Sequence, residues 1–244
     1  MTKNKKAVFF DLDGTLIPVD LDRMFSTYWD FVRESDLIRL IDNNTEKAIG
    51  IFNSAAKEMM SSKGGRPNKL VFFEHIEKMT GRGKDYFEKY FDAFYASVFD
   101  SLGSMIEKND IQRKIVDTVR SKGYRTALAT MPVFPVGAAV SRLSWVGLDP
   151  NDFEYISHWE NSNFMKPHPG YYKEILQRMG LEGKDCIMVG NNVKEDMCAR
   201  ELGFDVFLVT GHEIGDYKKE DFMCGSLDEL HHWAQNMPCA EESV

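Results

Sequence analysis

The sequence predicts an α/β fold: a parallel β-sheet with helices on both faces, and an all-helical unit inserted after the first strand. Three observations predict it. A four-residue apolar run at residues 7–10 ends in two carboxylates, strand and helix patterns alternate from Lys114 onward, and residues 19–103 show helical patterns with no strand between them. The chain has 244 residues, of which 43% are hydrophobic and 28% charged. That is enough for one large domain, or for a core with a smaller insertion.

The alternating part predicts a Rossmann-like sheet. The run Ala-Val-Phe-Phe at residues 7–10 is typical of a buried parallel strand. Gly123 and Gly180 stand where two helices should end. We expect helices at 111–122, 136–146, 170–179, 193–202 and 227–236, and further strands at 124–130, 153–157, 186–189 and 204–209. Short apolar strands separated by helices indicate a parallel sheet covered on both faces.

The inserted part predicts a helical cap. Amphipathic segments lie at 21–41, 46–61, 68–79 and 85–99, separated by polar breaks and breaks rich in glycine and proline. We therefore expect residues 19–103 to form a cap domain, and residues 1–18 together with 104–244 to form the core. Aromatic residues recur at helical spacing between Tyr86 and Tyr95, and such a stripe is typical of packing inside a helical unit.

Composition limits the partners and the compartment. The net charge of -8 argues against binding duplex nucleic acid, whereas a few local cations suffice for a small phosphorylated ligand. We expect no membrane span, because no apolar run approaches ~20 residues, and no signal peptide, because the run after Lys6 is too short. Four cysteines without a Cys-x-x-Cys pair favour reduced thiols in a cytoplasmic protein. The oligomeric state is left open.

Asp11 and Asp13 are the first candidate site residues. Alternation along an extended chain points both side chains the same way, and Gly14 lets the backbone turn away. They follow the first strand at its carboxyl end, where open α/β sheets bind ligands. Two adjacent acids can bind a hard cation, or divide the roles of nucleophile and proton donor. Taken alone, Asp-x-Asp-Gly is also typical of a turn that ends a strand.

Three further candidates follow later strands. The hydroxyl of Thr130, with the backbone N–H of Met131, can hold a phosphate oxygen, although threonine is also ordinary at a strand end. Lys166 precedes a proline-rich helix start, where anions bind well, although a lone lysine is usually a surface charge. Asp196 opens a predicted helix, where a carboxylate also interacts favourably with the helix dipole.

In this order, the four segments resemble the motifs of the haloacid dehalogenase superfamily. Asp11-Leu-Asp-Gly-Thr15 matches the first motif, Thr130 the second, Lys166 the third, and the segment 190–196 the fourth. The helical insertion lies where one subgroup keeps its cap. The resemblance covers the chain apart from the cap sequence, and it implies a Rossmann-like fold and phosphatase chemistry, since the dehalogenase branch usually lacks the second acid.

The resemblance also implies roles for these residues. Asp11 would attack phosphorus and form an aspartyl-phosphate, a known carboxylate-nucleophile route. Asp13 would protonate the leaving oxygen and later deprotonate water, which requires a raised pKa. Thr130, Met131 and Lys166 would bind phosphate oxygens. A Mg²⁺ ion would lie between the phosphate and Asp11, with the backbone carbonyl of Asp13 as a further ligand.

The fourth motif departs from the family pattern. The family normally places two acids there, four or five residues apart, and the first is a metal ligand. Counting back from Asp196 gives Asn192 or Asn191, and neither is charged. An amide oxygen can still ligate Mg²⁺, but the site loses one negative charge. Glu195 or Asp196 could compensate.

Function follows as a leading hypothesis with two rivals. We expect a Mg²⁺-dependent hydrolase of small phosphomonoesters that takes a small phosphorylated metabolite as its substrate. The rivals are a phosphotransferase or mutase acting on a sugar phosphate, and a degenerate member that binds a phosphorylated metabolite without turnover, which the two asparagines keep open. Arg66, Arg82 and Lys84 are cap cations that could select the substrate, or could be solvated loop charges.

Overall fold

A computed structural model describes residues 5–41, 43–107 and 109–240, and in them six parallel strands form one sheet in the order β3-β2-β1-β4-β5-β6. The strands are β1 (Ala7–Phe10), β2 (Arg125–Leu128), β3 (Tyr155–Ile156), β4 (Cys186–Gly190), β5 (Asp205–Val209) and β6 (Met223–Gly225). β1 is central, and Phe10 lies in register with Leu128 on one side and Val189 on the other. The predicted fold class is confirmed.

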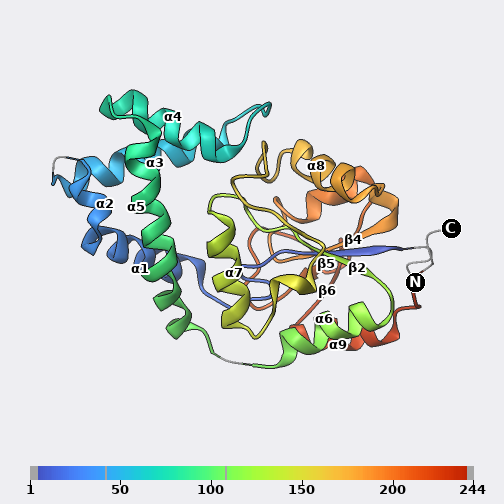
Figure 1. The fold of residues 1–244 in the computed structure, drawn as a ribbon. Helices are drawn as coiled ribbons and strands as arrows, with labels where there is room; N and C mark the ends of the chain where they lie inside the picture. The colour runs from blue at the N-terminus through green and yellow to red at the C-terminus, as the bar shows by residue number, and fades with distance from the viewer. Residues whose placement is uncertain (1–4, 42, 108, 241–244) are drawn as a thin grey trace.

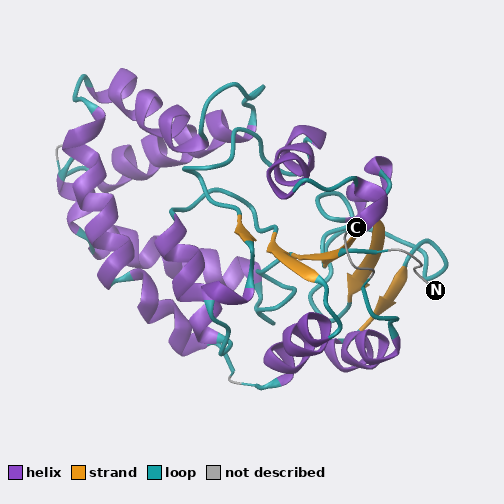
Figure 2. Ribbon diagram, turned by 45° about the vertical axis from the view of Figure 1, so that its right-hand side comes forward, coloured by secondary structure: helices purple, strands orange, loops and turns teal. Residues whose placement is uncertain are grey.

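Side-chain alternation along β1 divides the sheet into two buried faces. Val8 and Phe10 belong to the cluster that contains α6 (Ile111–Ser121), α7 (Val136–Trp145) and α9 (Leu227–Asn236). Ala7 and Phe9 belong to the opposite cluster, with α8 (Pro169–Met179). Figure 1 shows α8 above the sheet with α6 and α9 below it, and Figure 2 shows the strands in orange with helices on both sides. Four fully buried residues explain why the run is uninterruptedly apolar.

The insertion between β1 and α6 is entirely helical in its described residues. Its helices are α1 (Leu21–Glu34), α2 (Asp36–Arg39), α3 (Thr45–Met60), α4 (Asn68–Thr80) and α5 (Lys84–Ser97), followed by the 3₁₀ helix η1 (Phe99–Met105). They form the left-hand part of Figure 1. Trp145 of α7 stacks on Phe99 with ring centroids 5.7 Å apart and donates a hydrogen bond to Asp100 at 2.9 Å. The insertion is therefore anchored on the sheet's helical layer at its C-terminal end.

Aromatic side chains fill the interior of this insertion. Phe87, Phe91, Phe94 and Tyr95 of α5 are buried, which confirms the packing predicted for these rings, although Phe91 and Tyr95 also line a cavity and Tyr86 is 39% exposed. Edge-to-face contacts join Phe91 to Phe52 and to Phe73. Such pairs add to the stability that burial alone supplies.

Two predicted helices differ from the observed structure, and one observed strand was not predicted. The helix expected at 21–41 is divided, because the Ser35 side chain accepts the N–H of Leu37 and starts α2. The helix expected at 193–202 is a turn followed by the 3₁₀ helix η4 (Met197–Leu202), because the Asn192 side chain holds the N–H groups of Lys194 and Glu195. The short strand β6 was not predicted. Two further 3₁₀ helices are η2 (Pro150–Asp152) and η3 (Gly183–Asp185).

The remaining expectations concern the whole chain. No helix within the described ranges is both long and apolar enough to cross a bilayer. All four cysteines are free thiols, as expected. No signal peptide was predicted at the N-terminus. Residues 1–4 of that segment lie outside the described residues. The boundaries 1–18, 19–103 and 104–244 stay predictions.

Candidate active site

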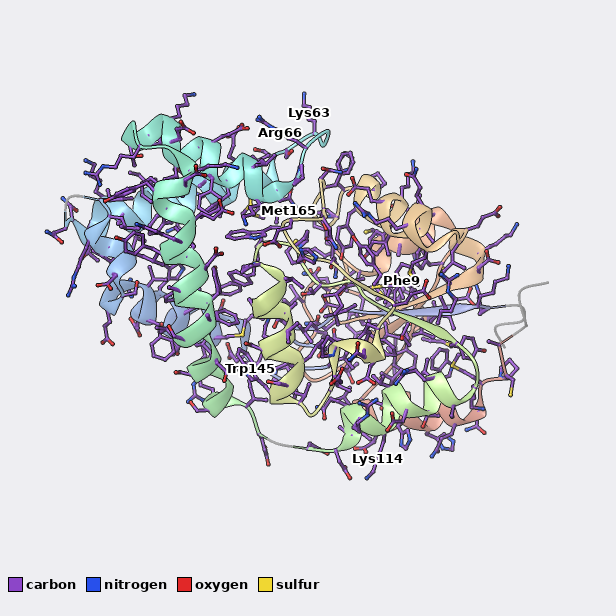
Figure 3. The ribbon with its side chains drawn as sticks, in the orientation of Figure 1. Phe9, Lys63, Arg66, Lys114, Trp145 and Met165 are labelled. Carbon is purple, nitrogen blue, oxygen red and sulfur yellow. The ribbon has the colours of Figure 1, made fainter. Side chains whose placement is uncertain are left out.

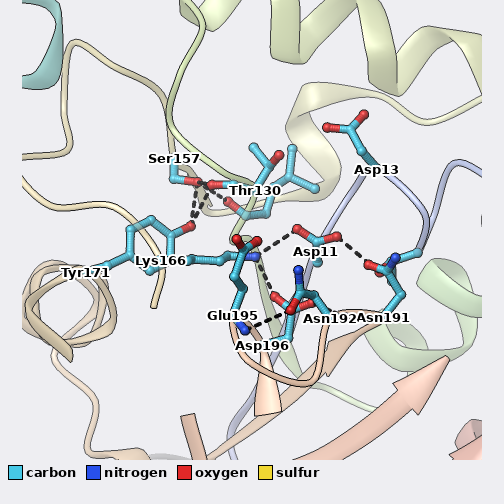
Figure 4. A network of polar contacts seen from close by, with 12 residues as sticks. Asp11, Asp13, Thr130, Ser157, Lys166, Tyr171, Asn191, Asn192, Glu195 and Asp196 are labelled. Carbon is cyan, nitrogen blue, oxygen red and sulfur yellow. Dashed lines mark hydrogen bonds and ion pairs between the residues drawn. The ribbon is translucent and has the colours of Figure 1, made fainter. Parts of the chain in front are cut away.

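A buried lysine joins the ends of two central strands. Asp11 follows β1, and its N–H donates to the Val189 carbonyl of β4 at 2.9 Å. The Lys166 ammonium donates to Asp11 Oδ1 at 2.8 Å and to Asp196 Oδ1 at 2.6 Å (Figure 4). All three residues are buried. The candidates from the first, third and fourth motifs therefore meet at the carboxyl edge of the sheet, the edge at which parallel α/β proteins bind ligands.

Charge pairing governs protonation in this cluster. Burial works against the charge of Lys166, but Asp11 and Asp196 hold the pKa of its ammonium well above the usual value. Burial raises the pKa of Asp196 to about 7, against the attraction of Lys166. A buried charge persists only where partners compensate for its lost hydration, and Lys166 has two. The Asp196 carboxylate therefore accepts hydrogen bonds from the Lys166 ammonium and from the Asn192 N–H, the latter at 2.9 Å. Its side chain makes no capping bond to η4.

Asn191 and Asn192 have different surroundings. The Thr15 hydroxyl lies 3.1 Å from Asp11 Oδ2 and 3.1 Å from Asn191 Oδ1, so those two oxygens converge on one point. The Asn191 amide donates to the His212 carbonyl at 2.7 Å. The Asn192 side-chain oxygen instead accepts the N–H groups of the turn that follows it. Of the two asparagines, Asn191 is the one whose side-chain oxygen faces Asp11.

Gly14 permits this close approach. Its φ of +83° lies in the left-handed region that favours glycine, and a Cβ there would lie 2.2 Å from Asn191 Nδ2. The backbone of the turn after β1 thus lies directly against the Asn191 side chain of the loop after β4. That contact places the Asp11 and Asn191 oxygens side by side.

Asp13 is paired with a buried arginine. Arg142 of α7, 2% exposed, donates to Asp13 Oδ2, while Asp13 Oδ1 is buried with no hydrogen-bond partner in the described structure. Burial raises the pKa of Asp13 and the neighbouring Asp11 charge adds to this, although Arg142 opposes it. A carboxyl with a raised pKa is suited to give and take a proton.

Two hydroxyl groups fix the backbone of Thr130. Its carbonyl accepts the Ser157 hydroxyl at 2.7 Å and the Tyr171 hydroxyl at 2.8 Å (Figure 4). The Thr130 hydroxyl is buried and has no hydrogen-bond partner among the described residues. Buried polar atoms are usually satisfied, so an unsatisfied hydroxyl beside Asp11 and Lys166 indicates a ligand atom. Met131 lines the adjoining cavity.

A cavity of about 420 Å³ opens from these carboxylates into the insertion. The core contributes Asp11, Asp13, Met131, Val133, Phe134, Trp159, Met165, Asn191, Asn192, Glu195, Asp196 and Ile214. The insertion contributes Leu21, Phe25, Tyr28, Trp29, Val32, Leu37, Phe52, Asn53, Ala56, Met59, Met60, Phe72, Phe91 and Tyr95. All the charged lining residues come from the core, and the volume is typical of a small-molecule site.

The three cap cations do not line this cavity. Arg66 forms an ion pair with Glu74 at the outer surface, and Figure 3 places it near Lys63 at the edge of the molecule. Arg82 donates to the Leu40 carbonyl at 2.6 Å and to the Tyr86 hydroxyl at 3.0 Å. Lys84 starts α5. The structure therefore brings none of the three to the carboxylates.

Sequence reasoning gave no role to Thr15, Arg142, Ser157 or Tyr171. Arg142 carried a signal, because it lies four residues after Ala138 and three after Ala139, on the apolar face of its helix. Thr15 belonged to the first motif, but its contact with Asn191 joins residues 176 positions apart. Ser157 and Tyr171 carried no signal, since hydroxyls at such positions are ordinary.

The donor set suits a hard divalent cation. The Asp11 carboxylate and the Asn191 amide present converging oxygens, and oxygens are the ligands that Mg²⁺ prefers. The Asn192 oxygen accepts two backbone N–H groups and each Asp196 oxygen has its own donor, whereas Asp11 Oδ2 and Asn191 Oδ1 share the single hydroxyl proton of Thr15. These residues therefore fit a magnesium ion. Its side-chain ligands include one carboxylate, that of Asp11, whereas an acid at position 191 would supply a second.

Comparisons with known proteins agree on the family. The chain is 24% identical to a glyceraldehyde 3-phosphate phosphatase of Methanothermobacter thermautotrophicus, over 91% of this chain and 93% of the relative. It is also 24% identical to a phosphatase of the same name from Methanocaldococcus jannaschii, over 95% and 98%. A HAD phosphatase from Thermococcus onnurineus shares the fold, with a TM-score of 0.58, 19% identity, and 93% and 97% covered.

The family itself is shown by a match to a family model. The family model of haloacid dehalogenase-like hydrolases matches residues 5–203. That span includes β1 to η4 and all four strand-end segments. The resemblance inferred from the motifs is thereby confirmed, and the chain belongs to the haloacid dehalogenase-like hydrolase family.

Proposed function

We propose that this protein is a Mg²⁺-dependent hydrolase of small phosphomonoesters that works through an aspartyl-phosphate on Asp11. One observation carries the proposal. Asp11 is held by Lys166 on one oxygen and approached by the Thr15 hydroxyl on the other, with the second acid, Asp13, two residues away. A carboxylate fixed in this way is oriented for attack on a phosphorus atom.

The first step transfers the phosphoryl group to the protein. An Asp11 oxygen forms a bond to phosphorus while the ester P–O bond breaks, and Asp13 delivers its proton to the departing oxygen. Lys166 and the unpaired Thr130 hydroxyl bind phosphoryl oxygens, where charge accumulates in the transition state. The raised pKa of Asp13 supports its being protonated when the leaving group departs.

The second step releases phosphate. Asp13, now a carboxylate, accepts a proton from a water molecule that attacks phosphorus, and the bond between phosphorus and the Asp11 oxygen breaks. Asp11, Asn191 and the backbone carbonyl of Asp13 would hold Mg²⁺, which when bound neutralises the repulsion between the phosphate and Asp11. The helical insertion would act as the cap that excludes water from this site.

Two relatives named as phosphatases support phosphoryl chemistry over dehalogenation, and so does the presence of Asp13. Asn191 favours a second candidate, a protein that binds a phosphorylated metabolite without turnover. An amide at that position leaves the ion with one anionic ligand fewer, which weakens Mg²⁺ binding.

The test is hydrolysis of p-nitrophenyl phosphate with and without Mg²⁺, by wild type and by Asp11→Asn. We expect Mg²⁺-dependent release of inorganic phosphate by wild type and a loss of at least about 1,000-fold in the variant, as for removal of a covalent nucleophile. Acid quenching during turnover should trap phosphate on wild type. If wild type shows no Mg²⁺-dependent turnover above the variant, while a phosphonate still binds, the binding-protein candidate is correct.

A further inference from the structure

We infer that the substrate is the phosphomonoester of an apolar alcohol, with an aliphatic or aromatic group that fills the cavity between the sheet and the insertion. This inference rests on the proposed phosphatase function and names its substrate class. It differs from the polar three-carbon substrate in the names of the two curated relatives.

The part of the cavity beyond the carboxylates is apolar. Its walls combine aliphatic, thioether and aromatic side chains from α1, α3, α4 and α5 with Phe134, Trp159 and Met165 of the core. None of the lining residues in the described structure is a lysine, arginine or histidine. A sugar or triose buried here would leave hydroxyl or carbonyl groups without partners, and an unsatisfied buried polar group is costly.

The insertion supplies few polar groups to the cavity, and the two tyrosine hydroxyls among them already form a hydrogen bond with each other. The hydroxyls of Tyr28 and Tyr95 bond to one another at 3.0 Å, so the pair offers one remaining O–H to an occupant. Asn53 belongs to an exposed residue, and Trp29 adds one indole N–H donor. The contacts available deep in the cavity are therefore those that an alkyl chain or an aromatic ring makes.

The mouth of the cavity is apolar as well. Phe25, Met60 and Ile214 are 40%, 60% and 41% exposed, and all three line the cavity from different segments. Ile214 is fixed beside the fourth-motif loop, because its N–H donates to the Asn191 carbonyl and its carbonyl accepts the Val193 N–H, both at 2.9 Å. Exposed apolar side chains gathered on one opening indicate a binding site for an apolar group.

Chain-length dependence tests the inference. We would measure kcat/KM for ethyl, butyl and hexyl phosphate alongside glyceraldehyde 3-phosphate. Burying a methylene should raise kcat/KM by about threefold, so hexyl phosphate should exceed ethyl phosphate by roughly 100-fold, and it should also exceed glyceraldehyde 3-phosphate. A flat or falling series, or a preference for the triose phosphate, would overturn the substrate class while leaving the phosphatase proposal intact.

A pair of variants tests whether the dependence on alkyl chain length comes from this cavity. Ala56→Phe fills the cavity from α3, and it should lower the ratio of hexyl to ethyl phosphate kcat/KM by about tenfold or more. Ala93→Phe makes the same change on the exposed face of α5, outside the cavity, and should leave that ratio unchanged. Equal ratios in the two variants would contradict the assignment of the cavity.

A binding measurement tests this inference independently of catalytic turnover. Trp29 and Trp159 line the cavity, so tryptophan fluorescence should report ethyl- and hexylphosphonate binding even in an inactive protein. Tighter binding of hexylphosphonate, by about 100-fold, supports the substrate class whether or not phosphomonoesters are hydrolysed. Equal affinity for the two phosphonates overturns it.

Discussion

Arg142 of α7 donates a hydrogen bond to Asp13 and so joins the second acid of the first motif to a helix far along the chain; the two partners are 129 positions apart. The arginine is almost completely buried, and its Nε also donates to the Ala138 carbonyl at 3.1 Å. Asp13 therefore has a fixed position and a fixed cationic neighbour. Because Arg142 acts on the proposed reaction only through Asp13, it is a positioning residue.

Replacing Arg142 should change both rate and pH dependence. In Arg142→Met, burial of Asp13 is no longer opposed by the charge and hydrogen bond of Arg142, and only the smaller effect of the Lys166 charge remains, so the pKa of Asp13 rises further. Asp13 must be protonated to act as the acid, so the alkaline limb of the kcat/KM profile should move to higher pH, and kcat should fall by about 10- to 100-fold. Arg142→Lys should restore part of both. An unshifted limb in Arg142→Met would contradict the pairing.

Asn191 should set the strength of magnesium binding. Asn191→Asp adds an anionic oxygen next to Asp11, and we expect the Mg²⁺ concentration for half-maximal activity to fall by about tenfold. Asn192→Asp is the matched control, because the Asn192 oxygen accepts backbone N–H groups in its own turn. Titration calorimetry with Mg²⁺ reports the same difference without turnover. Tightening in Asn192→Asp alone would reverse the assignment.

Gly190 should be required for the position of Asp196. A Cβ at the end of β4 would lie 2.3 Å from the Asp196 carboxyl carbon, and both groups are buried. Gly190→Ala should lower the free energy of unfolding by about 1–3 kcal/mol, the usual cost of overpacking, and should reduce activity. Gly50→Ala makes the same change within α3, where nothing lies within 4 Å of the new Cβ, and should not destabilise the protein. Urea unfolding of both variants measures the difference.

Asp152 should make stability depend on acidic pH. Burial raises the pKa of Asp152, but the hydrogen bond and charge of Arg113, the Asp149 N–H and the charge of Arg120 outweigh it and lower the pKa below 3.8. A depressed folded-state pKa means that the carboxylate contributes stability that is fully present above the unfolded pKa and lost as pH falls through the folded one. Asp152→Asn should therefore cost about 1–3 kcal/mol at pH 6 and progressively less below pH 3.8.

Urea unfolding at pH 6 and pH 3 measures that difference. Asp110→Asn is the control, because Asp110 pairs with Lys114 at a side chain that is 70% exposed, and such pairs contribute little. A destabilisation by Asp152→Asn that is equal at both pH values would show that the ion pairs with Arg113 and Arg120 are not its source.

The central strand and the acids that follow it could be predicted from the local sequence pattern. Residues 7–10 are apolar because both faces of β1 are covered, and that burial leaves a signal in four consecutive letters. Asp11 and Thr130 could be found because each lies at the end of a predicted strand, and parallel strands bring their carboxyl ends to one edge. Lys166 could be found because it directly precedes a predicted helix and completes the order of the motifs. The cap cations were weaker predictions, because a charge in a loop has no periodicity that shows which way it faces.

By itself, therefore, the sequence determined the fold class, the family and the order of the strand-end residues, all of which follow from short-range patterns of burial and from motifs. Only the tertiary structure decided that Asn191 rather than Asn192 faces Asp11, that Asp13 is paired with Arg142, and that the cavity is walled by apolar side chains of the insertion. Each of these is a contact between segments far apart in the chain. Packing creates such contacts, and no local spacing of residues records them.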